Sequence, residues 1–344
     1  MKIRHIVLSL AALIFFAIIV SFLFALYTEA GTSLVIKAVR SAAPDAIDVA
    51  QVTGRVGYRL HIEGLTLRVS GNTVRVASTD LQWHPVYLAV GKLPIEKLKL
   101  KDVTITGARK EKKPVDLGLP RLSRWTSVFR AFINHLSIEG LVYTAPGSKP
   151  VSVHALTAGI LLDRGVLYLD GLNVKSGLVD IGGTIILNLV HPGLRAALNG
   201  SLHEKALGFD TISLSADLPA SHGKEQVAGV VVLKAFAGKK ERLRFECSIG
   251  LQRQAVRVTD ARLTKADNGG ALAANAAIDL SGSKPAFDIS GKLVKLDLAP
   301  ELPQGTSLSG DFHAAGSTDD FEGGISLGNA GPYWKDMAIC VSII

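Results

Sequence analysis

The chain has 344 residues, of which 48% are hydrophobic and 20% are charged, and its formal net charge is +8. This apolar content excludes a disordered chain, and with only 6% aromatic residues the buried faces must be built from aliphatic side chains. Two cysteines exclude a disulfide framework in a chain of this size. Two unpaired thiols are favoured, and one long-range bond between Cys247 and Cys340 stays open.

An apolar run at residues 6–27 contains no charged residue, and serine is its only polar side chain apart from the closing Tyr27. A helix of this length spans about 33 Å, enough to cross a hydrocarbon core of ~30 Å. Basic residues precede the run and Glu29 is the first charge after it, so the N-terminus is expected in the cytoplasm. We predict a retained transmembrane anchor over residues 1–27. The alternative, a cleaved signal peptide, usually has an apolar region of only about 7–15 residues.

The remainder divides into three segments. Residues 28–45 predict a short helix that continues from the anchor and ends at Pro44. Residues 46–330 consist of short alternating runs separated by Gly, Pro, Asn and Asp, which is typical of an antiparallel meander. Residues 331–344 break this rhythm, and we expect them to be a truncated or frameshifted terminus.

A repeated unit lies within the predicted strands. It is apolar at its first, third, sixth and eighth positions and has Gly or Asp at the fifth. Simple alternation would put the first two apolar side chains on the opposite face from the last two. One extra residue, a β-bulge, puts all four on one face, and Gly or Asp tolerates the backbone that a bulge needs. The unit occurs at 60–67, 98–105, 136–143, 167–174 and, more weakly, 256–263, so the predicted bulge positions are Gly64, Asp102, Gly140, Gly171 and Asp260.

The spacing of this unit indicates the fold. The first three copies begin 38 residues apart, and repetition at such intervals indicates an elongated array. We predict a mainly β protein in which a transmembrane helix precedes an elongated, curved antiparallel β-sheet that forms an open groove, a β-taco or half-pipe. The predicted groove-lining residues are Leu60, Ile62, Leu65, Leu67, Leu98, Leu100, Val103, Ile105, Leu136, Ile138, Leu141, Leu167, Leu169, Leu172 and Val174.

Helical segments able to cover this apolar face are scarce. The best is an amphipathic helix predicted at 119–133, with Arg121, Arg124 and Arg130 outside its apolar stripe. It would lie at the membrane surface or serve as a lid, or else pack against the sheet. The surrounding basic block would meet anionic headgroups or an acidic partner, and a solvated loop is the alternative. Nucleic acid is not expected as a partner across a membrane from the cytoplasm.

Large uncovered apolar faces mark ligand or partner surfaces, and the expected guests are acyl chains or nascent strands of membrane proteins. The sequence contains no zinc-type ligand spacing, nucleophile elbow or P-loop. Acidic residues stand singly at bulges and turns, unlike the paired carboxylates of a glycan hydrolase. We therefore expect no enzyme and no cofactor.

Residues 28–32, 52–56, 60–67, 80–85 and 95–105 resemble the amino-terminal region of the translocation and assembly module TamB family, which is related to AsmA-like bridge proteins of diderm envelopes. The resemblance covers residues 1–110 and continues by pattern to about 325. It implies an inner-membrane anchor, a β-groove in the periplasm and phospholipid delivery to the outer membrane. It also implies assembly of outer-membrane proteins with an outer-membrane partner of the Omp85 class. Members are normally much longer and end in a domain that engages this partner.

Two functions are compatible with these features. A lipid conduit is favoured, in which acyl chains lie on the apolar face. The alternative is a scaffold whose sheet edges pair with client strands through main-chain hydrogen bonds.

Overall fold

The computed structural model describes residues 24, 26–69, 71–107, 117, 129–204, 208–221, 227–266, 270–282, 284–296, 307–317, 319–329 and 338–343. Most of the predicted anchor lies outside these residues, as do Arg121 and Arg124 of the predicted amphipathic helix. Within the described ranges, no helix is both long enough and apolar enough to cross a bilayer.

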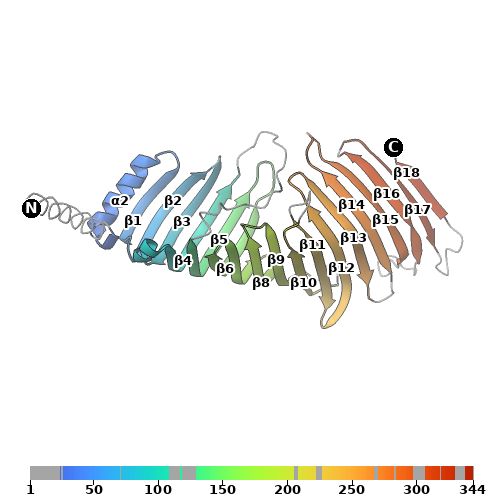
Figure 1. Ribbon diagram of the computed structural model, residues 1–344, viewed down its shortest axis with the longest axis horizontal. Helices are drawn as coiled ribbons and strands as arrows, with labels where there is room; N and C mark the ends of the chain where they lie inside the picture. Colours follow the sequence, from blue (N-terminus) through green and yellow to red (C-terminus); the bar gives the residue numbers. More distant parts are fainter. Residues whose placement is uncertain are drawn as a thin grey trace, which may run out of the picture. The chain divides into compact units, whose positions relative to one another are not determined.

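The protein is mainly β and separates into two compact units (Figure 1). The first unit comprises residues 1–109, 128–164 and 173–177, and the second comprises residues 110–127, 165–172 and 178–344. Strand β7 (Val166–Ser176) contributes residues to both. The first unit contains α2 (Glu29–Ala42), β1 (Ile47–Arg55), β2 (Arg59–Val69), β3 (Asn72–Trp83), the 3₁₀ helix η1 (Pro85–Val90), β4 (Lys92–Thr106), β5 (Arg130–Thr144) and β6 (Val151–Asp163).

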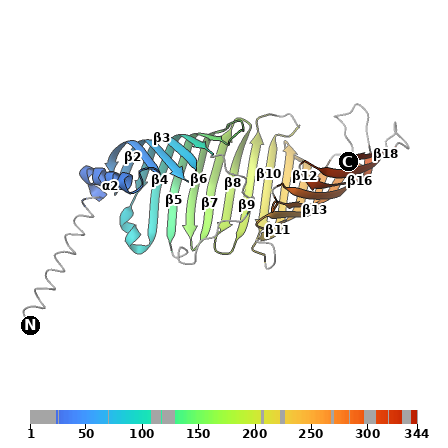
Figure 2. The ribbon, with the colours of Figure 1, turned by 90° about the horizontal axis from the view of Figure 1, so that it is seen from above.

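Strands β1 to β6 pair in chain order, and Figure 2 shows β2 and β3 running obliquely to β4–β6. Four of the five pairs are antiparallel, but β4 and β5 are parallel, so the prediction of a purely antiparallel sheet was wrong here. Parallel neighbours need a crossover connection of a dozen or more residues. The chain between Thr106 and Arg130 is long enough to supply it.

Strand β5 also corrects the helix predicted at 119–133. Arg130 and the three residues after it belong to the strand, and the short apolar run of Ala131, Phe132 and Ile133 fits a strand as well as a helix. The backbone N–H of Arg130 donates to Gly91 O, and its guanidinium Nε lies 3.9 Å from Asp163 Oδ1. Arg130 is therefore a residue at the end of a strand, and its predicted place on an amphipathic helix was wrong.

The helix α2 lies beside β1 at the start of the sheet (Figure 1), within the segment predicted to be helical. Thr28 caps it, because its Oγ1 accepts a 2.9 Å hydrogen bond from Gly31 N. Thr32 is buried, and its Oγ1 accepts a 3.1 Å hydrogen bond from Val56 N in the β1–β2 turn. The helix covers a sheet edge that would otherwise offer unpaired backbone groups.

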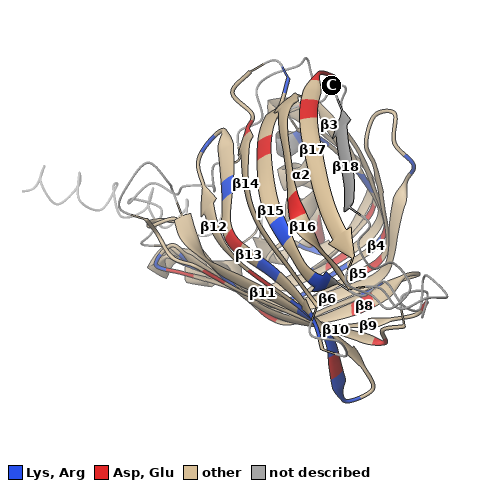
Figure 3. Ribbon diagram, turned by 90° about the vertical axis from the view of Figure 1, so that its right-hand side faces the viewer, with Lys and Arg blue, Asp and Glu red and all other residues tan. Residues whose placement is uncertain are grey.

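The second unit is a series of antiparallel pairs from β8 to β18. Its strands are β8 (Val179–Asn188), β9 (Gly193–Leu202), β10 (Thr211–Leu218), β11 (Val227–Ala237), β12 (Lys240–Leu251), β13 (Ala255–Lys265), β14 (Ala271–Asp279), β15 (Ala286–Leu296), β16 (Leu308–Ser317), β17 (Phe321–Asn329) and β18 (Ala338–Ile343). Figure 3 shows charged residues spaced along β13–β17. Strand β18 pairs with β17, so residues 338–343 continue the meander where a break in the strand rhythm was expected.

Candidate functional site

The candidate site is the apolar face of the first unit, where the repeated sequence units come into register. Each of the four apolar positions of a unit lies opposite an equivalent position on the neighbouring strands. Strands in a sheet are about 4.8 Å apart, so residues aligned in this way form continuous rows. The four rows run through Leu60, Leu81, Leu98, Leu136 and Ala158; through Val52, Ile62, Thr79, Leu100, Ile138 and Leu156; through Val49, Leu65, Val76, Val103, Leu141 and Val153; and through Ile47, Leu67, Val74, Ile105, Tyr143 and Val151.

Between the second and third rows the side-chain alternation changes phase. Val76 and Thr79 on β3 are three residues apart, and strict alternation would put them on opposite faces. Both are nevertheless buried, at 4% and 5% exposed, whereas Ala77 between them is exposed. At this change of phase one residue of each strand lies between two paired residues. We call the cross-strand row of these residues the crease; it consists of Ala50, Gly64, Ala77, Asp102, Gly140 and His154.

The five predicted bulge positions all have a left-handed backbone, with φ of 62° at Gly64, 50° at Asp102, 70° at Gly140, 58° at Gly171 and 53° at Asp260. At Asp260 the pairing also shifts, so β13 carries one residue more than its neighbours there. Along the crease the register is unbroken: Val76 pairs with Val103 and Ser78 with Lys101, on either side of Asp102. The predicted β-bulge, with one extra residue in a single strand, is therefore wrong in the first unit. Neighbouring strands there change their side-chain alternation together, at the same row.

The predicted lining residues are neither sealed off nor fully exposed. Leu60 and Val103 are buried, and the other thirteen are partly buried, including the four on β7. A face covered by a second layer would bury most of them. Among the described residues the only helices are α2, beside β1, and η1, between β3 and β4. In the described part of the first unit, the aliphatic rows therefore have no second layer of secondary structure over them.

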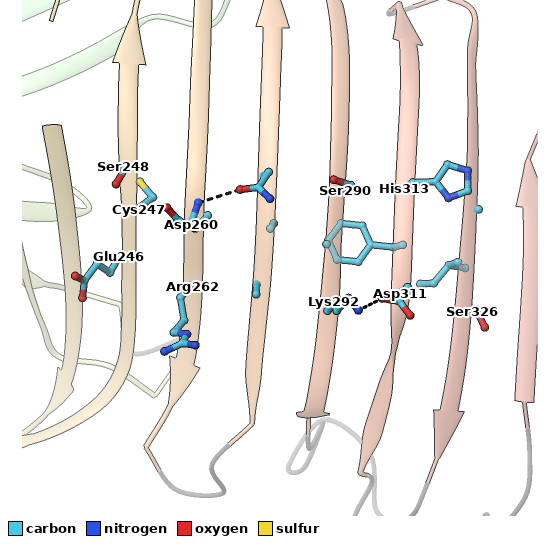
Figure 4. A pocket seen from close by; sticks show the side chains of 18 of the residues that line it. Glu246, Cys247, Ser248, Asp260, Arg262, Ser290, Lys292, Asp311, His313 and Ser326 are labelled. Carbon is cyan, nitrogen blue, oxygen red and sulfur yellow. Dashed lines mark hydrogen bonds and ion pairs between the residues drawn. The ribbon is translucent and has the colours of Figure 1, made fainter. Parts of the chain in front are cut away.

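The second unit has a hollow of about 1030 Å³ over the middle of β11–β17 (Figure 4). Along its floor a row of mostly small residues runs through Ala261, Ala274, Gly291, Phe312 and Ile325. The Phe312 ring lies against Gly291, where a Cβ would collide with it. No pattern in the sequence singled out this row, because it contains only one bulky aromatic among alanines and glycine.

Two left-handed residues of the second unit, Asp260 and Lys295, are hydrogen-bonded in the same way. The backbone N–H of Asp260 donates to Asn275 Oδ1 of β14 at 2.9 Å (Figure 4), and that of Lys295 donates to Ser309 Oγ of β16 at 3.0 Å. Lys295 has φ of 49° beside a register shift. A short polar side chain on the next strand thus satisfies a donor that the bulge removes from the ladder. Lys295 was missed in the sequence, because lysine carries no bulge signal.

Ion pairs lie on the other face of the first unit. Lys99 Nζ is 2.7 Å from Glu139 Oε1, and this hydrogen bond lowers the pKa of the Glu139 carboxyl. His61 Nδ1 is 2.8 Å from Asp80 Oδ1, and that carboxylate raises the pKa of the His61 imidazole. Within the described part of the chain, no group of three or more His, Cys, Asp or Glu residues is arranged to hold a metal ion.

Cys247 is a free, buried thiol in the second unit, and desolvation raises its pKa. The side chain of Cys340 lies outside the described residues.

Comparison with known proteins gives one match. Residues 18–217 match the family model described as TamB, N-terminal domain. No curated protein and no solved structure gives a significant match. The matched segment covers more than half of the 344 residues and contains all four aliphatic rows and the crease. The chain therefore belongs to the TamB family.

Proposed function

We propose that this protein carries phospholipid acyl chains on its apolar sheet face and so supports phospholipid transport to, and biogenesis of, the outer membrane. The observation that supports this proposal is the set of four aliphatic rows, which are aligned across β1–β6 and left partly exposed. Membership of the TamB family supports the same assignment.

The physical reason is the cost of hydrating these rows. Burying one aliphatic side chain completely contributes about 1.5–3 kcal/mol, so a face of such residues gains free energy when an apolar guest displaces water. An acyl chain is a flexible guest that can follow a row from strand to strand without a fixed pattern of hydrogen bonds. The proposed role is that of a carrier without catalysis or cofactor, and nucleic acid has no part in it.

In this proposal residues 6–27 anchor the chain in the inner membrane, with the N-terminus in the cytoplasm and the bulk in the periplasm. Basic residues before the apolar run and the acidic Glu29 after it support that orientation. The sheet then begins directly beside the bilayer from which lipid would be taken.

Photo-crosslinking in living cells tests the proposal. A photoreactive amino acid replaces Leu100, whose neighbours in its row are Thr79 and Ile138. We expect phospholipid adducts at this position. The matched control places the same probe at Thr104, an exposed residue on the same strand beyond the crease, where no adduct is expected. Equal lipid yields at both positions, or none at Leu100, would reject the lipid-carrier role.

The alternative is a scaffold for outer-membrane protein assembly, acting with an Omp85-class partner. Membership of the TamB family supports it as well. A strand edge can recruit a client strand by β-augmentation. This function predicts crosslinks from a probe at Ser342 to outer-membrane protein precursors, with no dependence on lipid capture at Leu100.

A further inference from the structure

The β1–β2 turn is hydrogen-bonded to the end of the predicted transmembrane run and to the helix that follows it. Gly57 N donates a 2.6 Å hydrogen bond to Leu26 O, and Val56 N donates to Thr32 Oγ1 at 3.1 Å. On the other side, Trp83 Nε1 donates to Val56 O. The turn therefore stays next to the end of the predicted transmembrane run, and the side chains on the turn lie close to that end.

Exposed apolar side chains gather around this turn. Tyr58 of the turn is 51% exposed, and in η1 Val86 and Tyr87 are each 53% exposed and Val90 is 66% exposed. The His84 ring links the two segments, because its centroid lies 5.9 Å from that of Tyr58 and 6.5 Å from that of Tyr87. A cluster of tyrosines and aliphatic residues that protrudes into solvent is typical of a surface that enters the headgroup region of a membrane.

The same edge carries cations that make no ion pair with any described residue. Arg55 and Arg59 lie directly opposite each other in the β1–β2 pair, and like charges in that position are destabilising. Among the described residues, no ion pair involves Arg55, Arg59 or the nearby Lys97. The two arginines line a hollow of about 440 Å³, together with Tyr58, Glu29 and Asp80 among others. Asp80 is already bonded to His61, and the one remaining carboxylate of the hollow, Glu29, leaves two arginine charges unbalanced, so an external anion can bind beside them.

We propose that Tyr58, residues 86–90 and the pair Arg55/Arg59 form a membrane-docking edge, which rests in the headgroup region of the anionic bilayer that holds the predicted anchor. Phosphate groups of the lipids neutralise the repulsion between the two arginines. The apolar side chains of η1 enter the boundary between the headgroups and the acyl chains. Leu60 and Leu81, the first large residues of one aliphatic row, lie next to Arg59 and its partner Gln82. Docking would therefore place the start of this aliphatic row at the bilayer surface. The proposal rests on the predicted anchor and on the proposed periplasmic location, but not on lipid capture by the rows.

Fluorescence quenching on the full chain in lipid nanodiscs tests the docking edge. An environment-sensitive fluorescent amino acid replaces Leu88 of η1, and the nanodiscs contain lipids with a nitroxide on the headgroup. We expect quenching in discs of anionic phosphatidylglycerol and less quenching in neutral discs. In the variant R55Q/R59Q the ratio of docked to free edge is expected to fall by about fivefold for each arginine removed, and added salt should act in the same direction.

The control puts the probe at Val69, an apolar residue at the far end of β2 that is 60% exposed, against 40% for Leu88. About ten residues of strand separate it from Arg59, which is roughly 33 Å, so no quenching is expected there. Equal quenching at both positions, or none at position 88, would overturn the proposal. Quenching at 88 that ignores both lipid charge and the arginine substitutions would overturn the role of the arginines. Circular dichroism of R55Q/R59Q verifies that the sheet is intact. Quenching at 88 without lipid adducts at Leu100 would reject the lipid-carrier function alone.

Discussion

Leu98 of β4 and Leu136 of β5 lie directly opposite each other in a parallel pair, although 38 residues separate them in the chain. The interval of the sequence repeat is thus the register of a strand pair. The pairing of β4 with β5 keeps this 38-residue offset throughout, from Lys92 opposite Arg130 to Thr106 opposite Thr144. This alignment is why the aliphatic rows continue without offset from β4 to β5.

Gly140 is expected to be sensitive to substitution by a branched residue. Its φ is +70°, and a Cβ there would lie 2.9 Å from Asp102 Oδ1 of the neighbouring strand. Gly140→Val should lower the free energy of unfolding by about 1–3 kcal/mol, measured by chemical denaturation followed by circular dichroism. Gly177→Ala is the control, because the nearest atom to its Cβ would be 4.0 Å away and its φ is not left-handed. Unfolding midpoints that are the same for both variants would contradict the crease as a constraint.

The Lys99–Glu139 ion pair should make stability depend on acidity. Lys99 lowers the pKa of Glu139 below its ordinary value of 4.5, so the pair stabilises the fold above that value. This contribution disappears as the pH falls through the lowered pKa of the folded state. We expect Lys99→Met to reduce stability more near pH 7 than near pH 3. In a Glu139→Gln background, the pH dependence of this effect should vanish; if it persists, another group is responsible.

A charge placed in an aliphatic row should block lipid capture. Leu100 and Ile138 are partners in one row, so Leu100→Glu would put a carboxylate beside any acyl chain that lies there, at a high desolvation cost. We expect the yield of lipid adducts from a photoreactive probe at Ile138 to fall strongly. Thr104→Glu adds the same charge at an exposed position of the same strand and should leave the yield unchanged. Limited proteolysis verifies folding, and unchanged capture in Leu100→Glu would count against the rows as the lipid path.

Cys247 should resist thiol reagents in the native protein. It is 2% exposed, and burial raises its pKa above the ordinary value of 9.0, which lowers the thiolate fraction that reacts. In a Cys340→Ser background we expect a maleimide to label Cys247 only after unfolding in denaturant. Complete labelling of the folded protein within minutes would show that the second unit opens at β12.

Five left-handed positions could be predicted from the sequence because each has Gly or Asp, which tolerate that backbone, inside the repeated apolar pattern. Gly64, Asp102 and Gly140 each interrupt an apolar pattern at the same place. The unbroken register could not be predicted, because Ala50 and Ala77 change phase in the same row and alanine carries no such signal. Each strand was therefore expected to bulge alone.

The parallel direction of β5 relative to β4 could not be predicted from the sequence either. The interval from Leu60 to Leu98 contains the intervening strand β3. The described residues of the equal interval from Leu98 to Leu136 contain no third strand, and β4 pairs directly with β5. Equal spacing thus describes two different connections. In the same way, residues 130–133 carry apolar side chains that fit either period, and pairing with β4 and β6 decides for a strand.

A fold line shared by adjoining strands restricts how such a protein can evolve. Adding or deleting one residue near Gly64 or Asp102 would displace half of a strand relative to both of its partners, so selection should remove it. Duplicating a whole hairpin preserves the line, because each new strand already contains the change of side-chain alternation at the correct position. Growth by complete hairpins is therefore the route by which a chain of this kind changes its reach while keeping the same profile in cross-section.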